Sequence, residues 1–213
     1  MRTALVAGAT GLIGKQLLND LLSETYYDVV KAVTRRPLGV IHPKLVNVVI
    51  DFDDLRLHAN QLRADDVFCC LGTTIRQAGS QEQFRKVDHD YPVMLAEVAK
   101  AEGASQYLLV SALGAKASSS IFYNRVKGET ERAIQNLGFE SLHIFRPSLL
   151  LGARSEHRAG EEAAKTFYSF FGWLLPAKYK GIDSGKVARA MVKVASQSRK
   201  GSFIYESAAL QEF

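Results

Sequence analysis

A tyrosine and a lysine stand four residues apart, at Tyr123 and Lys127, in a segment with helical spacing of its apolar residues. On a helix such a pair shares one face, about 5–6 Å apart. A free tyrosine hydroxyl has a pKa of about 10 and is a poor base at neutral pH. A neighbouring cation favours the phenolate, so the pair is suited to general acid–base catalysis. Taken alone, the spacing also fits an ordinary pair on a helix surface.

A serine hydroxyl precedes this pair. Ser111 stands twelve residues before Tyr123, at the end of the apolar, strand-like run 107–111. The carboxyl ends of parallel strands form the ligand-binding edge of such a sheet, so this hydroxyl is placed to hydrogen-bond a substrate carbonyl. The serines at 118–120 are interpreted as a capping turn before the helix, and one of them remains an alternative for the working hydroxyl.

Three glycines spaced G-x-x-G-x-x-G, Gly8, Gly11 and Gly14, follow a first strand-like run and open the first helix. Glycines permit the tight turn and a close approach of the backbone to a pyrophosphate, which the free N–H groups of a helix N-terminus bind. The loop therefore predicts dinucleotide binding. A glycine-rich turn without a ligand is the alternative. The predicted phosphate-binding residues are Gly8, Thr10, Gly11, Leu12, Ile13 and Gly14.

The residues after the second strand-like run indicate which nicotinamide cofactor binds. In an NAD site an acidic residue about 20 positions after the loop binds the ribose 2′-hydroxyl. Here Arg35 and Arg36 stand twenty-one and twenty-two positions past Gly14, and no carboxylate ends the run. Two guanidinium groups suit a 2′-phosphate. We predict NADP(H) rather than NAD(H); a solvated surface pair is the alternative.

The elements that must position these residues alternate along the chain. Apolar runs rich in β-branched residues predict strands over 4–7, 28–34, 46–50, 67–71, 107–111 and 142–145. Helical periodicity predicts helices over 12–22, 81–87, 91–102, 121–137 and 184–195. This alternation predicts an α/β fold, a doubly wound parallel sheet of the Rossmann type. With 213 residues the chain forms a single domain, 1–213, to which 152–213 contributes a small C-terminal cap on the substrate side.

Composition excludes several other classes of protein. Hydrophobic residues make up 47% of the chain and charged residues 23%, which is too apolar for a disordered chain. The net charge of +5 lacks the clustering of a nucleic-acid binder, so no nucleic-acid partner is expected. No apolar stretch is long enough to span a membrane, and the five histidines lack metal-ligand spacing. The adjacent Cys69 and Cys70 are predicted to be reduced, packed thiols of a cytoplasmic protein.

An aromatic-rich segment at 165–176 lies within the predicted cap. We expect it to pack over the cofactor cleft and line an apolar substrate pocket. A surface for a membrane face or a protein partner is the alternative.

The glycine loop and the Ser111, Tyr123 and Lys127 set together resemble the short-chain dehydrogenase/reductases, especially their extended and atypical members. Further motifs narrow the resemblance to the atypical branch that includes the Tat-interacting oxidoreductase-like proteins. It extends roughly from residue 3 to 154. The motifs are Thr34-Arg35-Arg36, Asp51-Phe52, Cys69-Cys70-Leu71-Gly72-Thr73-Thr74, Val87-Asp88 with Asp90-Tyr91, Tyr123-x-x-x-Lys127-Gly128-Glu129 and Phe145-Arg146-Pro147.

The resemblance implies a role for each member of the set. Tyr123 would donate the proton to the substrate carbonyl, Lys127 would bind the nicotinamide ribose and tune the tyrosine, and Ser111 would orient the substrate. The resemblance also implies cofactor contacts elsewhere. These are Asp51 and Phe52 beside the adenine, Leu71, Gly72 and Thr73 along the cofactor, and Pro147 and Ser148 near the nicotinamide.

The predicted function is that of an NADP(H)-dependent oxidoreductase that moves hydride to or from a small carbonyl or alcohol, as a monomer or homodimer without stable membrane insertion. A non-catalytic NADP(H)-binding sensor that acts through protein partners is the alternative. Epimerase or dehydratase chemistry on the same scaffold also stays open, because fold alone does not separate these reactions.

The arginine pair generates a first testable prediction. Arg35→Asp should lower the affinity for NADPH far more than that for NADH, because it replaces a 2′-phosphate ligand with a repelling carboxylate. Titration of the purified variant with each cofactor measures the difference. Equal losses for the two cofactors would contradict the assignment of the arginines.

Overall fold

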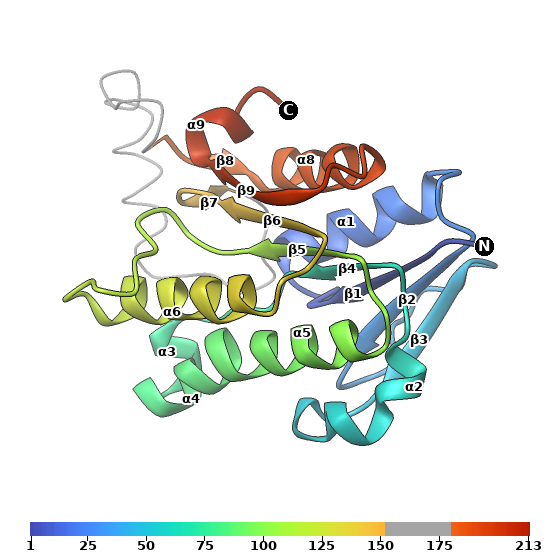
Figure 1. Ribbon diagram of the computed structural model, residues 1–213, viewed down its shortest axis with the longest axis horizontal. Coiled ribbons are helices and arrows are strands. Elements are labelled where there is room, and N and C mark those ends of the chain that lie inside the picture. Colours follow the sequence, from blue (N-terminus) through green and yellow to red (C-terminus); the bar gives the residue numbers. More distant parts are fainter. Residues whose placement is uncertain (152–179) are drawn as a thin grey trace.

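The computed structural model describes residues 1–151 and 180–213 (Figure 1). Within this part of the chain a seven-stranded sheet has the order β3-β2-β1-β4-β5-β6-β9, and every neighbouring pair is parallel. Its strands are β1 (Thr3–Ala7), β2 (Val29–Thr34), β3 (Leu45–Val49), β4 (Asp66–Cys69), β5 (Gln106–Val110), β6 (Ser141–Arg146) and β9 (Gly201–Glu206). Two further short strands, β7 (Leu150–Leu151) and β8 (Ile182–Asp183), pair with each other.

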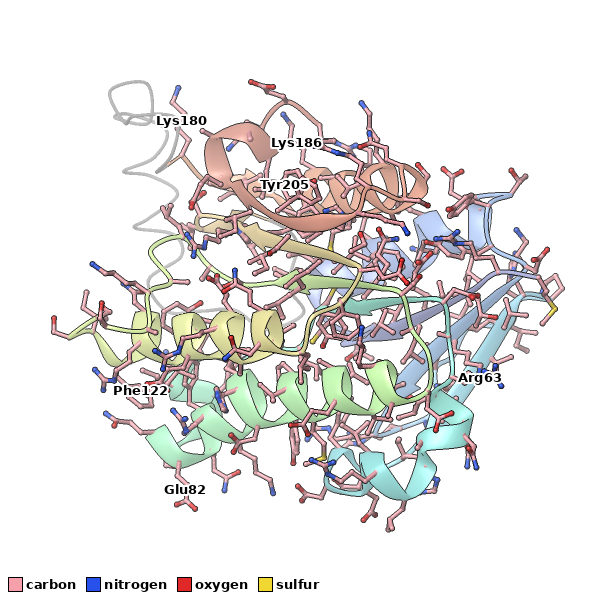
Figure 2. All side chains as sticks on the ribbon, viewed as in Figure 1. Arg63, Glu82, Phe122, Lys180, Lys186 and Tyr205 are labelled. Carbon is pink, nitrogen blue, oxygen red and sulfur yellow. The ribbon has the colours of Figure 1, made fainter. Side chains whose placement is uncertain are left out.

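Helices cover both faces of the sheet (Figure 1). One face carries α1 (Leu12–Ser23), α8 (Ser184–Ser196) and the short α9 (Ser207–Leu210). The other carries α5 (Tyr91–Ala101) and α6 (Phe122–Asn136), which lie side by side. Figure 2 shows Phe122 at the start of α6 on the opposite side of the sheet from Lys186 of α8. The shorter turns are a 3₁₀ helix (Phe52–His58), α2 (Ala59–Leu62), α3 (Ile75–Ala78), α4 (Gln81–Arg85) and a π-helical turn (Lys86–Asp90).

Two apolar layers form the core, one on each face of the sheet. On one face, Leu17 and Leu21 of α1 and Met191 of α8 pack on the strands, and on the other Leu95 of α5 and Ile134 of α6 do so. Each of these side chains is fully buried. Strands covered on both faces have continuous apolar runs, which is why the strand pattern was visible in the sequence.

The doubly wound parallel sheet and its six predicted strands are confirmed, but the seventh strand was not predicted. The last strand, β9, is at the edge, and its residues alternate between exposed and half-buried, so it lacks the apolar run of a central strand. Part of the range expected in the cap thus belongs to the Rossmann body, because β9 pairs with β6 and α8 packs on α1. The aromatic segment 165–176 lies outside the described residues.

A buried polar network joins the strands at the edge opposite the carboxyl ends. The Asp66 carboxylate accepts both forks of the Arg2 guanidinium, at 2.8 and 2.9 Å, and the Tyr27 hydroxyl at 2.7 Å. The Gln106 side chain donates to the same carboxylate and accepts from Ser141. These bonds satisfy polar groups that would otherwise be costly to bury.

The network ends at a histidine that is neutral in the folded protein. His143 is fully buried, its ring nitrogens lie 2.8 Å from Ser141 Oγ and 3.1 Å from the Tyr205 hydroxyl, and it stacks on Phe203. Burial, aided by the Arg199 guanidinium, lowers the pKa of His143 to about 4. A neutral ring donates through one nitrogen and accepts through the other, which suits this pair of hydroxyl partners.

This histidine makes folding stability depend on pH. In the unfolded chain His143 takes up a proton below its usual pKa of 6.5, whereas the folded protein resists protonation down to about 4. The free energy of unfolding should therefore fall as the pH drops through this window. Urea denaturation of the protein and of His143→Gln across the window measures the difference in slope. Equal slopes would contradict the assignment.

Candidate functional site

A large cleft opens at the carboxyl ends of β1, β4, β5 and β6, with a volume of about 1370 Å³. The strand order reverses direction between β1 and β4, and doubly wound sheets bind ligands at such a switch point. The cleft brings together most of the predicted site residues. Its wall includes Thr10, Gly11, Leu12, Ile13, Leu71, Gly72, Thr73, Ser111, Tyr123, Lys127, Pro147 and Ser148.

The loop between β1 and α1 requires its glycines. Gly8 has a φ of +86°, and a β-carbon there would lie 2.5 Å from the carbonyl oxygen of Cys70. At Gly14 a β-carbon would lie 2.1 Å from the carbonyl oxygen of Gly8. The helix then begins after Gly11, and no side chain of the described residues caps it. The first-turn amides are therefore available to an anionic ligand at the cleft.

The two arginines lie in the turn after β2, where both side chains are exposed and have no acidic partner among the described residues. This turn is held by neighbouring polar groups. Thr34 Oγ1 donates to the Arg36 carbonyl at 2.7 Å and accepts from the Asn47 amide at 2.8 Å. Neither Arg35 nor Arg36 lines the cleft itself. They are free to meet a ligand that extends beyond it along the sheet edge.

The loop after β4 is tied to a carboxylate on the π-helical turn. The Thr73 backbone N–H donates to Asp88 Oδ2 at 2.8 Å. A β-carbon at Gly72 would lie 3.3 Å from Asp88 Oδ1, so the loop backbone passes close to this carboxylate. Asp88 is 1% exposed. A π turn inserts one extra residue into a helix and often marks a functional site.

The same carboxylate holds the predicted catalytic lysine. Lys127 Nζ lies 2.8 Å from Asp88 Oδ1, and because both residues are buried the contact is a buried ion pair. Burial lowers the pKa of Lys127, but the Asp88 carboxylate and Tyr123 outweigh it and raise the pKa above its usual value. The lysine is thus a cation at neutral pH.

Tyr123 lies one turn before Lys127 on α6 and lines the cleft. Its ring packs against Phe84 of α4, with 5.4 Å between the ring centroids. Its hydroxyl makes no hydrogen bond with the described residues. The ring is held in place, and the hydroxyl remains available to a substrate.

Ser111 also lines the cleft, but its hydroxyl already has a partner. It donates to Glu131 of α6, with 2.5 Å between the oxygens. Glu131 is itself paired with Arg146 at the end of β6. Of the serines at 118–120, Ser119 accepts from the Ile121 amide in a turn before α6, but the predicted capping is wrong, because Ile121 is the N-cap of α6 and no side chain in the described part of the chain caps this helix. None of those three serines lines the cleft.

The remaining predicted residues fall into two groups. Pro147 and Ser148 are in the wall, where the Ser148 amide donates to Ser207 Oγ at 3.1 Å. Asp51 and Phe52, which were predicted to lie beside the adenine, are not in the cleft wall. Asp51 is exposed and accepts from the Asp53 amide, and Phe52 is buried with its ring 5.5 Å from that of Tyr91. The Phe52 side chain therefore serves the core.

Sequence reasoning did not assign roles to Asp88, Glu131 or Arg146. One signal for Glu131 was present, because it follows Tyr123 and Lys127 at the same spacing of four and so shares their face of α6. Asp88 and Arg146 stand in motifs that carry the family resemblance, but no local pattern indicates their roles, because their partners lie far along the chain.

The parallel sheet and the cleft at its switch point define the chain as a Rossmann-type, dinucleotide-binding protein. A family model described as NAD(P)H-binding matches residues 8–198, and the chain belongs to this family. Protein HTATIP2 of Rattus norvegicus is 41% identical over 171 residues, which cover 78% of this chain and 70% of the relative. Protein FMP52, mitochondrial, of Coccidioides immitis is 34% identical over 95% of this chain and 89% of its own length.

Solved structures share the fold at lower identity. A short-chain dehydrogenase/reductase family oxidoreductase from Burkholderia thailandensis has a TM-score of 0.71 at 20% identity, covering 98% of this chain and 92% of its own. MoeE5 in complex with UDP-glucose and NAD has a TM-score of 0.73 at 18% identity. The match covers 95% of this chain and 74% of the MoeE5 chain. Among the described residues, no helix has the length and apolar character needed to cross a membrane.

The buried ion pair yields a prediction about stability. Asp88→Asn leaves the Lys127 ammonium buried without a counter-charge, which should lower the free energy of unfolding by about 3–5 kcal/mol. The deficit should shrink as the pH rises, because an unpaired buried ammonium loses its proton more readily. Urea denaturation at about pH 7 and about pH 9.5 measures both effects.

The matched control is Asp90→Asn, whose side chain is half exposed and pairs with His89. It should change stability by no more than about 0.5 kcal/mol. A similar, small loss in both variants would contradict the role given to the Lys127–Asp88 pair.

Proposed function

We propose that this protein is an NADP(H)-dependent oxidoreductase that transfers hydride to or from a small carbonyl or alcohol. The observation that carries the proposal is one cleft lined by an uncapped helix N-terminus and by Ser111, Tyr123 and Lys127. A nicotinamide cofactor is supported by the solved structures of the same fold, because MoeE5 forms a complex with NAD.

The residues present fit a dinucleotide. The close contact at Gly8 and the free first-turn amides of α1 form a cradle for a pyrophosphate. The exposed Arg35 and Arg36 are the reason for proposing NADP(H), since their guanidinium groups suit a 2′-phosphate. When bound, the nicotinamide supplies or accepts the hydride.

The protein's own part in the reaction is to move a proton. Tyr123 presents a hydroxyl to the cleft and gives its proton to the carbonyl oxygen, or takes it from the alcohol in the reverse direction. Lys127, held as a cation by Asp88, stabilises the phenolate that remains. The buried ion pair keeps this charge fixed, so little reorganisation is needed as the proton leaves.

The second candidate is a non-catalytic NADP(H)-binding sensor that acts through protein partners. It would use the same glycine loop and arginines but would not need Tyr123. The similarity to the protein named HTATIP2 is compatible with either function.

The two free cysteines, one of them buried, support a reducing compartment such as the cytoplasm.

The deciding experiment follows NADPH oxidation by the purified protein over a panel of aldehydes and ketones. Tyr123→Phe should lower kcat by about 100-fold or more, because it removes the proton donor but keeps the ring against Phe84. Tyr26→Phe is the matched control, since Tyr26 lies at the opposite edge of the sheet and bonds to Ser198. Its kcat should match that of the unaltered protein.

Turnover that survives in Tyr123→Phe would place the acid elsewhere. Tight NADPH binding with no reduction by either protein would favour the sensor.

A further inference from the structure

The proton of the Ser111 hydroxyl is committed to a carboxylate behind the cleft. Ser111 Oγ donates to Glu131 Oε1 at 2.5 Å, and both residues are buried, at 6% and 4% exposure. The serine also lines the cleft, where its oxygen can meet a ligand. Whether the hydroxyl can donate a hydrogen bond to a ligand depends on whether Glu131 keeps accepting its proton.

Glu131 acts only as an acceptor. Arg146 grips it with both forks, Nε to Oε1 at 2.9 Å and Nη2 to Oε2 at 2.5 Å. Arg146 also donates to Glu206 of β9 at 2.8 Å. Hydrogen bonds to Glu131, and then to Glu206, raise the pKa of the guanidinium above its usual value despite partial burial. A carboxylate in such a pair has no proton to give back to the serine.

A serine hydroxyl has one proton and two lone pairs. With the proton on the Glu131 side, only lone pairs face the cleft. Ser111 therefore accepts a hydrogen bond from a ligand and has none to donate. A carbonyl oxygen is also only an acceptor, so it gains nothing from Ser111; the donor proposed for it is the Tyr123 hydroxyl.

We propose that Ser111 recognises a hydrogen-bond donor next to the reacting carbon, and that Glu131 is the positioning residue that imposes this preference. The substrate class is then a carbonyl compound with a hydroxyl or N–H group on the neighbouring carbon, such as an α-hydroxyketone. Tyr123 donates to the carbonyl while Ser111 accepts from the adjacent group. This inference rests on the oxidoreductase function proposed above and narrows its substrate.

Two ketones of nearly equal shape test the preference. 2-Hydroxy-1-phenylethanone carries a hydroxyl where 1-phenylpropan-1-one carries a methyl group. With NADPH, kcat/KM should be about tenfold higher for the hydroxyketone, the worth of one well-placed hydrogen bond. Part of such a ratio comes from the greater intrinsic reactivity of the hydroxyketone, so the decisive quantity is how the ratio changes between variants.

Ser111→Ala should lower the ratio of kcat/KM for the hydroxyketone to kcat/KM for the alkyl ketone about tenfold. This variant keeps the Glu131–Arg146 pair, so it retains the buried charge network. Glu131→Gln should also move the ratio toward that of Ser111→Ala, because the amide N–H group it introduces can donate to Ser111 Oγ and turn the hydroxyl proton toward the cleft. Glu129→Gln, whose side chain pairs with Arg85 on the outer side of α6, is the matched control and should leave the ratio unchanged.

A fall for both ketones alike in Ser111→Ala would overturn the proposal, because it would mean that the serine donates to the carbonyl. An unchanged ratio in both Ser111→Ala and Glu131→Gln would overturn it as well. A loss of activity in Glu131→Gln with equal effects on the two ketones would assign Glu131 a structural role only.

A second measurement separates this inference from the function on which it rests. Neutron diffraction from deuterated crystals of the unaltered protein locates the deuteron on Ser111 Oγ, which should point at Glu131. A deuteron directed into the cleft would overturn the proposal whether or not the protein is an enzyme. If neither ketone is reduced, binding to the NADPH-loaded protein by ligand-observed NMR should still favour the hydroxyketone. Equal binding of the two, or binding of neither at millimolar concentration, would overturn the substrate class.

Discussion

The Asp88 carboxylate is the point on which the arrangement of the site depends. One oxygen pairs with Lys127 of α6 and the other accepts from the Thr73 amide after β4, while the Asp88 carbonyl accepts from Thr130. A single buried residue thereby connects the π-helical turn, the β4 loop and α6. Burying an ion pair is costly unless its geometry and remaining bonds are good. The pair places a charge beside Tyr123, which an apolar contact of the same shape would not provide.

Two buried charges of opposite sign stand one turn apart on α6, yet each is paired with a different element. Lys127 is paired with Asp88, and Glu131 is paired with Arg146. If Lys127 and Glu131 paired with each other, Lys127 would not bind Asp88 and Glu131 would not bind Ser111 in the cleft wall. Because each residue pairs with a different element, the Lys127 ammonium acts on Tyr123 and the Glu131 carboxylate accepts from Ser111. Next to Lys127, the helix passes close to the loop before it, because a β-carbon at Gly128 would lie 2.2 Å from the backbone of Lys116 and Ala117.

Much of the fold could be predicted because its information is local. Buried strands such as β1 are continuous apolar runs, and Gly14 is required by a close contact with the Gly8 carbonyl within one turn of the chain. The seventh strand could not be predicted in this way, since Phe203 and Tyr205 alternate with exposed residues at an edge. The place of Tyr123, Lys127 and Ser111 in one cleft was also predictable, because parallel strands bring their carboxyl ends together.

The partners of those residues were not predictable, because they depend on contacts between distant segments. Asp88 and Lys127 are separated in the chain by α5 and β5, and only the π-helical turn directs the carboxylate to the lysine. The consequence is largest for Ser111. A serine at the end of a strand predicts a hydroxyl in the cleft, but whether that hydroxyl donates or accepts is decided by Glu131 behind it.

The last strand of the sheet, β9, also contributes to the orientation of the Ser111 hydroxyl. Glu206 of β9 holds one side of the Arg146 guanidinium, and Arg146 in turn holds Glu131 against the serine. A residue from the range expected in the cap is therefore connected to Ser111 in the cleft wall. The connection runs through three charged side chains, those of Glu206, Arg146 and Glu131. Because Glu131 is buried and is held by charged hydrogen bonds, the hydroxyl of Ser111 has little freedom to rotate toward the cleft. The polarity of this wall is thus a property of the whole sheet edge, from β5 through β6 to β9, rather than of the serine alone.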